Sequence, residues 1–270
     1  MELDRRWVSH ERDGKEILGY LAVPRAASIP LSPVLVIQEI WGPDEHIQDL
    51  ADRVAAAGYV ALAPDLYSRG GRPEALSSAR VQEFKAFLDT VPPTVWHDPK
   101  AMQESLSGRP KDEADRIKET QSVLFGPRDM AAMTMDLRSW IDFLSVHPAS
   151  QGKPVGSTGY CMGGALSFQL AVLEPRLKVA LVYYGQAPDE AELSRVKCPV
   201  YGFYGGQDHR ITDAVPKVQA KMREHGKIFE AQIYEDAGHA FFNDTRRSYD
   251  VLAARDAWAR TLAHFNRYLS

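Results

Sequence analysis

Apolar and polar positions along the chain predict strands and helices in turn, a pattern typical of α/β proteins. Short apolar runs predict strands, and apolar residues spaced three or four apart predict amphipathic helices. The predicted strands are residues 7–12, 17–23, 34–37, 59–63, 199–204 and 228–234, with a further strand that begins at Val155. The predicted helices are residues 44–57, 130–146, 165–173, 212–225 and 249–268.

The order of these elements predicts the architecture. The first two strands flank Asp13-Gly14, a turn pair typical of tight hairpins, so we expect an antiparallel ribbon at the N-terminus. The elements that follow predict a mostly parallel, doubly wound sheet. Two domains would fit into 270 residues, but α/β folds of this length are commonly single, so we expect one domain over residues 1–270.

A long segment interrupts the alternation before the predicted helix at 130–146. Residues 73–88 and 111–124 have helical patterns, whereas residues 91–99 contain three prolines and are unsuited to a helix. We therefore expect a helical insertion at about residues 70–128 that caps the substrate site. An insertion of this kind could equally be a static lid or a contact between protomers.

The most informative motif follows the strand that begins at Val155. Gly159-Tyr160-Cys161-Met162-Gly163 has the G-x-Nuc-x-G pattern of a nucleophile elbow, with cysteine as the nucleophile. Glycines are needed because side chains would crowd a strained turn from strand to helix. The N–H of Met162 then faces the same space as the sulfur, at the positive end of a helix dipole. Since a lone cysteine is more often a small buried residue, the motif needs support from elsewhere.

Two residues further along the chain supply that support. Asp208 and His239 each follow directly after a predicted strand. Nucleophile, acid and histidine, in this order, is the order of α/β-hydrolase triads, and it favours His239 over His209 as the base. The sequence therefore predicts a Cys161-His239-Asp208 triad, in which His239 generates the thiolate and Asp208 orients the imidazole.

Five segments spread over most of the chain identify a family. They are Gln38-Glu39-Ile40-Trp41-Gly42, Pro64-Asp65-Leu66-Tyr67, Gly159-Tyr160-Cys161-Met162-Gly163-Gly164, Gly205-Gly206-Gln207-Asp208-His209 and Ala237-Gly238-His239. In this order they resemble the dienelactone hydrolases, or carboxymethylenebutenolidases, of the α/β-hydrolase superfamily. The resemblance implies an α/β-hydrolase fold and hydrolysis of a small activated lactone or ester by the same triad.

The resemblance also implies roles for residues around the triad. Glu39 would help to activate a thiol that family members hold neutral at rest, and the backbone N–H groups of Ile40 and Met162 would form the oxyanion hole. Family members bind a substrate carboxylate with arginines, one of them four residues after the histidine. This chain has Asn243 at that position, which puts carboxylate recognition in doubt.

Candidate substrate contacts are of two kinds. Arginines of the insertion could replace the missing anion clamp, although surface arginines are usually solvated. Aromatic residues beside the motifs could line an apolar pocket, although such residues more often pack the scaffold. The predicted contacts are Trp41, Arg69, Tyr160 and Phe241, with Arg72 and Arg128 as further arginines of the insertion.

Composition narrows the class of protein. Hydrophobic content of 44% and charged content of 25% suit a sizeable core and are too polar for a membrane span. A net charge of -4, with no long run of either sign, argues against nucleic acid or an anionic membrane as partner.

We expect a small-molecule substrate and a monomer or small homo-oligomer. The N-terminus has no signal-peptide pattern, and a free catalytic thiol suits a reducing compartment, so we expect a cytoplasmic protein. No metal-site or nucleotide-binding motif is present, so no metal and no cofactor are predicted.

The leading hypothesis is a hydrolase that cleaves a small activated ester or lactone through a thioacyl-enzyme. Because thiolate is easily expelled, an intermediate from an unactivated ester or amide would tend to collapse back to substrate. A broader carboxylesterase or thioesterase is the rival that the insertion and Asn243 favour. A more remote alternative is a non-catalytic, redox-responsive binding protein in which the elbow cysteine is a sensor thiol.

Overall fold

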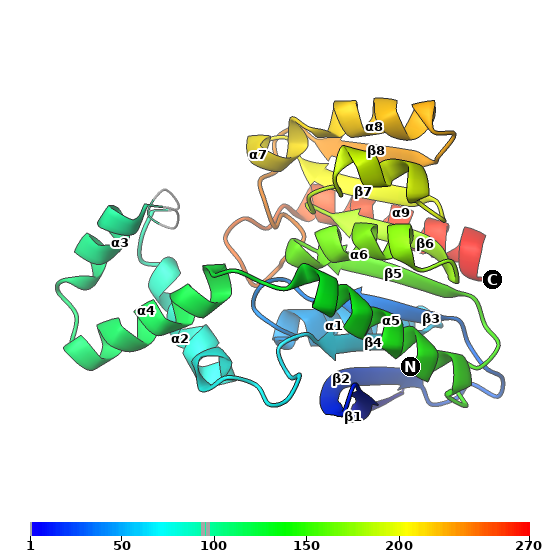
Figure 1. Cartoon of the computed structure of the whole chain (residues 1–270), viewed down its shortest axis with the longest axis horizontal. Coiled ribbons are helices and arrows are strands. Elements are labelled where there is room, and N and C mark those ends of the chain that lie inside the picture. The colour runs from blue at the N-terminus through cyan, green and yellow to red at the C-terminus, as the bar shows by residue number, and fades with distance from the viewer. Residues whose placement is uncertain (1, 93–94, 96–97) are drawn as a thin grey trace. The chain divides into compact units, whose positions relative to one another are not determined.

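The computed structural model describes residues 2–92, 95 and 98–270 in two compact units (Figure 1). One unit comprises the residues up to Leu66 together with Met130–Ser270, and the other comprises Tyr67–Asp129. Of the helices in the described residues, none has both the length and the apolar character that crossing a membrane requires.

The larger unit is built on an eight-stranded sheet with the order β1-β2-β4-β3-β5-β6-β7-β8. Strands β1 and β2 pair antiparallel, as do β2 and β4, and all later pairs are parallel. This arrangement confirms the expected α/β fold with its antiparallel ribbon. The strands are β1 (Leu3–Arg12), β2 (Lys15–Pro24), β3 (Pro33–Ile37), β4 (Val60–Asp65), β5 (Val155–Tyr160), β6 (Leu177–Tyr183), β7 (Val200–Gly205) and β8 (Phe229–Tyr234).

The N-terminal hairpin turns where the sequence predicts it. Asp13 and Gly14 both have positive φ, of 52° and 68°, and Arg12 pairs with Lys15 across the turn. Two central residues with positive φ are what a two-residue type I′ turn requires, and its twist matches that of the flanking strands.

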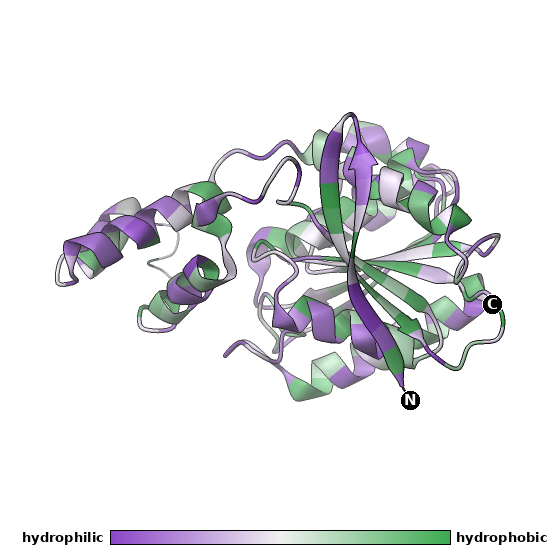
Figure 2. Ribbon diagram, turned by 90° about the horizontal axis from the view of Figure 1, so that it is seen from below, coloured by the Kyte–Doolittle hydropathy of each residue, from purple (hydrophilic) through white to green (hydrophobic). Residues whose placement is uncertain are grey.

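Helices cover both faces of the sheet (Figure 1). Helices α1 and α9 pack in one apolar cluster with residues of β3, β4 and β6, whereas α6 contacts β5 and β6 and also packs on α5. Apolar residues are concentrated in the central strands between these layers (Figure 2). The helices of this unit are α1 (Glu45–Ala56), α5 (Met130–Val146), α6 (Met162–Leu173), η3 (Glu190–Arg195), α7 (His209–Thr212), α8 (Val215–Glu224) and α9 (Val251–Leu269).

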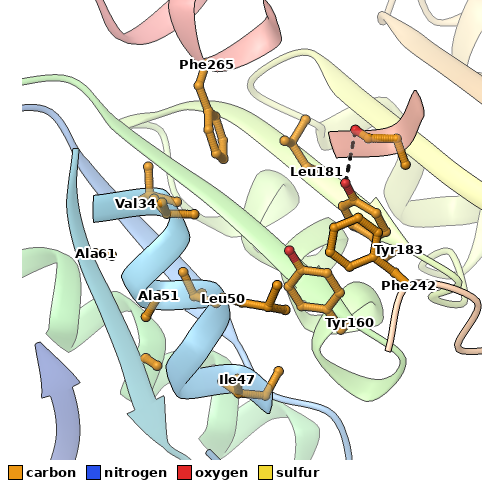
Figure 3. Packing of buried hydrophobic residues seen from close by; sticks show 14 of the residues in the cluster. Val34, Ile47, Leu50, Ala51, Ala61, Tyr160, Leu181, Tyr183, Phe242 and Phe265 are labelled. Atoms are coloured by element: carbon orange, nitrogen blue, oxygen red, sulfur yellow. Dashed lines mark hydrogen bonds between the residues drawn. The ribbon is translucent and has the colours of Figure 1, made fainter. Parts of the chain in front are cut away.

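Aromatic side chains form the centre of the core beneath α9 (Figure 3). The ring of Tyr183 lies 4.7 Å from those of Tyr160 and Phe203 and 4.8 Å from that of Phe242. Its hydroxyl is 2.6 Å from the Thr261 hydroxyl and donates to the Ala257 carbonyl at 3.2 Å. Tyr183 therefore joins β6 to α9 through both packing and hydrogen bonds.

The insertion has a helical structure of its own. It contains η1 (Glu74–Leu76), α2 (Ser78–Leu88), α3 (Pro99–Leu106) and α4 (Lys111–Phe125). The predicted helix 73–88 is thus divided in two, because Ser77 has φ -58° and ψ 152° and caps α2. Helix α3 was not predicted. Residues 93, 94, 96 and 97 of the predicted proline-rich connection lie outside the described residues.

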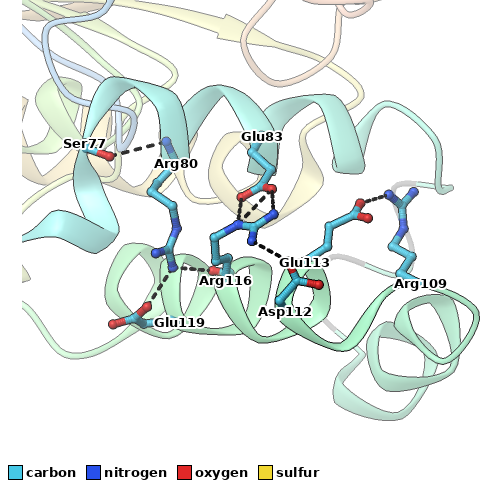
Figure 4. Close-up of polar contacts among 8 residues, drawn as sticks. All are labelled: Ser77, Arg80, Glu83, Arg109, Asp112, Glu113, Arg116 and Glu119. Carbon is cyan, nitrogen blue, oxygen red and sulfur yellow. Dashed lines mark hydrogen bonds and ion pairs between the residues drawn. The ribbon is translucent and has the colours of Figure 1, made fainter.

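Ion pairs join α2 to α4 (Figure 4). The Arg116 guanidinium donates to both carboxylate oxygens of Glu83, with the shortest contact at 2.6 Å, and also pairs with Asp112. Arg80 of α2 donates to the Arg116 carbonyl and to Glu119, each at 2.7 Å. This bidentate network fixes the relative position of the two helices.

The Tyr183 hydroxyl gives a stability prediction. Tyr183→Phe should lower the free energy of unfolding by about 1–2 kcal/mol, because it removes a buried hydroxyl that bonds to α9. The Ala257 carbonyl and the Thr261 hydroxyl then lose their Tyr183 partner. Urea denaturation checks this. Tyr249→Phe is the control, since that side chain is 40% exposed and its change should stay within about 0.5 kcal/mol. Equal losses in the two variants would contradict the role given to Tyr183.

Candidate active site

Cys161 stands at the turn between β5 and α6, in the N-cap position of the helix. Its backbone has φ 55° and ψ -114°. A non-glycine residue rarely adopts positive φ, and strain of this kind clusters at functional sites. The Cys161 N–H donates to the Tyr183 carbonyl at 3.0 Å, which ties the turn to β6. The side chain is partly exposed.

The glycines of the elbow are required by the close approach of backbone segments. A Cβ on Gly159 would lie 1.9 Å from the Gly163 carbonyl oxygen. A Cβ on Gly163 would lie 2.3 Å from the carbonyl oxygen of Ile37 and 2.4 Å from that of Gln38. The elbow therefore touches the end of β3. This contact brings the chain that leads to Ile40 to the first turn of α6, where Met162 lies.

Asp208 and His239 follow β7 and β8. His239 Nδ1 lies 2.6 Å from Asp208 Oδ2, and the aspartate side chain is only 8% exposed. Cys161 lies close enough to His239 for its charge to raise the pKa of the imidazole. Because Nδ1 is occupied by the aspartate, Nε2 is the ring nitrogen left for the sulfur. The three predicted residues therefore lie close together, and a hydrogen bond joins His239 to Asp208.

The electrostatic environment favours a charged imidazole. Burial by itself would lower the pKa of His239, but the negative charges of Cys161 and Asp208 and their hydrogen bonds outweigh it and raise the pKa to about 10. An imidazolium between a thiolate and a carboxylate is stabilised by both neighbours. The second cysteine differs, since burial raises the pKa of Cys198 to about 12 and keeps it a neutral thiol.

Glu39 follows β3 and is 2% exposed. The Tyr184 hydroxyl donates to its Oε1 at 3.2 Å, and Asn243 Nδ2 donates to its Oε2 at 2.7 Å. Asn243 Oδ1 accepts from the Thr245 N–H at 3.0 Å and from the Thr245 hydroxyl at 2.7 Å, which fixes the orientation of the amide. The Tyr184 ring lies 5.2 Å from the His239 ring. Tyr184 thus lies between Glu39 and the triad.

Burial and the charge of Glu39 raise the pKa of Tyr184 well above its ordinary value, so its hydroxyl stays a donor. Sequence reasoning missed this tyrosine, which lies directly after the unpredicted strand β6. It also missed the contact of Asn243 with Glu39, because the two residues are 204 positions apart.

A profile of the dienelactone hydrolase family matches residues 17–269. The chain belongs to this family. Membership makes it a carboxylic ester hydrolase acting on ester or lactone bonds and confirms the resemblance drawn from the motifs.

Related proteins cover nearly the whole of this dienelactone hydrolase family member. A protein of Saccharolobus solfataricus, provisionally named carboxymethylenebutenolidase, is 36% identical over 96% of this chain and 97% of its own length. A protein of Escherichia coli K12 with the same provisional name is 31% identical over 94% of this chain and 84% of its own. A crystal structure from Klebsiella pneumoniae, provisionally described as a dienelactone hydrolase, has a TM-score of 0.73 and 28% identity, and covers 99% of this chain and 100% of that one.

The predicted aromatic contacts divide into two groups in this family member. Tyr160 and Phe241 are fully buried in the core, so neither presents a surface to substrate, and we interpret both as scaffold. Trp41 is 8% exposed and lies beside the candidate oxyanion-hole residue Ile40, with the Arg246 guanidinium 5.6 Å from its ring. Of the aromatic candidates, Trp41 remains a predicted substrate contact.

His46, in the first turn of α1, is 2% exposed. Its Nδ1 lies 3.2 Å from Asp244, and its ring packs edge-on against Tyr160.

The predicted arginine contact Arg69 belongs to the insertion, together with the further arginines Arg72 and Arg128. Their contact with substrate stays a prediction.

The elbow gives a prediction about glycine. Gly159→Ala and Gly163→Ala should each destabilise the fold by about 2 kcal/mol or more, because the added methyl group meets fixed backbone and not a mobile side chain. Thermal unfolding together with esterase activity checks this. Gly108→Ala is the control, since a Cβ there has no neighbour within 4 Å. A stable, fully active Gly163→Ala protein would show that the elbow accommodates a Cβ at this position and would contradict the prediction.

The charge of His239 gives a pH prediction. The ring should lose its proton near pH 10, where the raised pKa lies, and not near its ordinary value of about 6.5. NMR titration of the His239 ring measures this. In Asp208→Asn and in Cys161→Ala the midpoint should fall, because each change removes a negative neighbour. A wild-type midpoint near neutrality would contradict the imidazolium assignment.

Proposed function

We propose that the protein cleaves a small activated ester or lactone through a thioacyl-enzyme formed on Cys161. The observation that best supports this is the proximity of Cys161, His239 and Asp208 at the C-terminal edge of the sheet, with His239 hydrogen bonded to Asp208 and Cys161 in strained backbone. Each triad member follows a parallel strand, which is the arrangement of α/β-hydrolases.

The proposed reaction begins with the thiolate of Cys161 beside the His239 imidazolium. The sulfur attacks the substrate carbonyl, and the oxyanion is stabilised by the N–H groups of Met162 and Ile40. When the intermediate collapses, the C–O bond breaks and His239 gives its proton to the departing oxygen. A water molecule then attacks the thioester while His239 accepts its proton. Expulsion of the Cys161 thiolate releases the acid and restores the ion pair.

Glu39 is proposed to modulate the thiol, as the family resemblance implies. Its carboxylate is connected to the triad through Tyr184, whose ring lies 5.2 Å from His239.

The choice of substrate follows from the nucleophile. Thiolate is a better leaving group than an ordinary alkoxide or amine. The tetrahedral intermediate therefore goes on to the thioester only when the departing group of the substrate is stabilised, and otherwise it expels the thiolate and returns to substrate. Enol lactones, enol or aryl esters and thioesters meet this condition. A broader carboxylesterase or thioesterase is the second candidate, and it is favoured by Asn243, which stands where an arginine would bind a substrate carboxylate.

The insertion is proposed to cap the substrate site. It follows β4, which runs parallel to β3, so the chain enters the insertion at the edge of the sheet where Cys161 follows β5. We also propose that the protein works in a reducing compartment such as the cytoplasm, because its nucleophile is a free thiol.

Replacing the nucleophile tests the proposal. Cys161→Ala should lower kcat for p-nitrophenyl acetate by at least about 10³-fold, because no thioester can form, and Asp208→Asn should lower it by a similar factor. Mass spectrometry of wild type mixed rapidly with substrate should show one acyl group on Cys161.

Cys198→Ala is the matched control and should keep wild-type activity, since that thiol is 8% exposed and neutral. Comparing a dienelactone with an acyl thioester then separates the two candidate functions. Full activity in Cys161→Ala would overturn both.

A further inference from the structure

A cavity of about 340 Å³ is lined by residues of β7, η3, α7 and α8 in the larger unit. Its volume falls within the range of small-molecule sites. Cys161, Asp208 and His239 are not among the described residues that line it. The lining includes Ile211 of α7, whose N–H donates to the Asp208 carbonyl at 3.0 Å. The cavity therefore borders the loop of the triad acid and is separate from the triad itself.

One part of the lining is apolar. It is formed by Leu193 of η3, Val215 and Val218 of α8, and Phe229 of β8. Leu193 and Val215 are 1% and 3% exposed, and the Phe229 ring packs against that of Phe168 with 5.3 Å between the ring centres. These side chains are held in place by the core, so they offer a preformed surface to the apolar body of a ligand.

The inner wall contains a hydroxyl without a hydrogen-bond partner. Tyr204 of β7 lines the cavity and is 1% exposed, and no contact in the described part of the chain supplies an acceptor for its hydroxyl. Burial raises the pKa of Tyr204, so the hydroxyl remains a donor. Its ring lies over Gly202, where a Cβ would come within 2.3 Å of Tyr204 Cε2. Because buried tyrosine hydroxyls usually have a partner, this one indicates an acceptor that a ligand would bring.

The charged side chains of the lining leave one cation unpaired. Glu190 pairs with Lys217 at 2.9 Å and with Lys221 at 3.4 Å. Arg210 of α7 lines the same cavity, and its guanidinium has no ion pair or hydrogen bond with any described residue. Asp189 is the other carboxylate of the lining, so the cations exceed the carboxylates by one. A carboxylate offers only acceptors and matches a guanidinium in a bidentate way, so it is the group that suits Arg210.

We infer that this cavity is a second ligand site, which binds a small organic acid with an apolar body and a hydroxyl group at the end remote from the carboxylate. Arg210 is exposed whereas Tyr204 is buried, so the carboxylate lies at the mouth and the hydroxyl lies inside. There the ligand's hydroxyl oxygen accepts a hydrogen bond from Tyr204. The site is independent of the reaction proposed for Cys161.

Three compounds of matched shape test the inference. Para-hydroxyphenylpropanoate has both polar groups, phenylpropanoate lacks the hydroxyl, and para-hydroxyphenylpropanamide lacks the charge. NMR titration measures the Kd of each. Wild type should bind the first compound with a Kd below about 1 mM. Loss of either polar group should weaken binding by about 5-fold or more, because each removes the partner of a donor in the cavity.

Two variants assign the two preferences to their residues. Arg210→Gln should bind the acid and the amide with similar Kd, and should still prefer the hydroxylated acid over phenylpropanoate. Tyr204→Phe should lose the preference for the hydroxyl and keep that for the carboxylate. Arg223→Gln is the matched control, since Arg223 is an exposed residue of α8 that does not line the cavity, and it should keep both preferences.

Two further changes locate the site. Ala214→Trp adds a large side chain at an exposed position of the lining and should weaken binding by about 10-fold or more. Ala220→Trp adds it at an exposed position of α8 outside the lining and should leave the Kd as in wild type. Alkylation of Cys161 with iodoacetamide, verified by mass spectrometry, fills the space at the triad and should also leave the Kd unchanged.

The outcomes decide the inference without reference to turnover. Absence of saturable binding to wild type would overturn it, as would equal Kd values for the three compounds. Binding that is lost on alkylation of Cys161 and retained in Ala214→Trp would place the ligand at the triad and would overturn the second site. Loss of esterase activity in Cys161→Ala bears on the proposed function alone.

Discussion

The active site depends on one close approach between backbone segments, that of the elbow to the end of β3. Gly163 lies so near the carbonyl oxygens of Ile37 and Gln38 that no side chain fits between them. The contact holds Cys161 in left-handed backbone and places the start of α6 against the chain that leads to Glu39 and Ile40. This packing positions the proposed nucleophile Cys161, the candidate oxyanion donors and the Glu39 carboxylate together.

The remaining parts of the site are added by neighbouring strands. β6 ends at Tyr183, after which Tyr184 reaches Glu39, while β7 and β8 are followed by Asp208 and His239. The C-terminal ends of parallel strands lie at the same edge of the sheet, so residues that follow different strands meet there although they are distant in the sequence. The aromatic core under α9 supports that edge, since Tyr183 packs between β5, β7 and α9.

Local patterns predicted the features that local physics determines. The Asp13-Gly14 turn, the elbow glycines and the succession of Cys161, Asp208 and His239 depend on backbone freedom and strand order, and all are visible in the sequence. The contact of Glu39 with Asn243 was not predictable, because it joins residues 204 positions apart and depends on how the loops fold back. Burial of His46 was not predictable for the same reason, since its partner Asp244 comes from the far end of the chain. Strand β6 begins only a few residues after α6 and was not predicted.

The order of these residues along the chain also has a consequence during synthesis. Cys161 leaves the ribosome well before Asp208 and His239, and Glu39 leaves long before its partner Asn243. Until His239 has emerged and β8 has joined the sheet, the cysteine lacks the base that is proposed to make it reactive. A nascent chain therefore carries an unactivated thiol from the synthesis of Cys161 until that of His239. The proposed nucleophile would become reactive only when folding is almost complete, which would protect it from premature alkylation or oxidation.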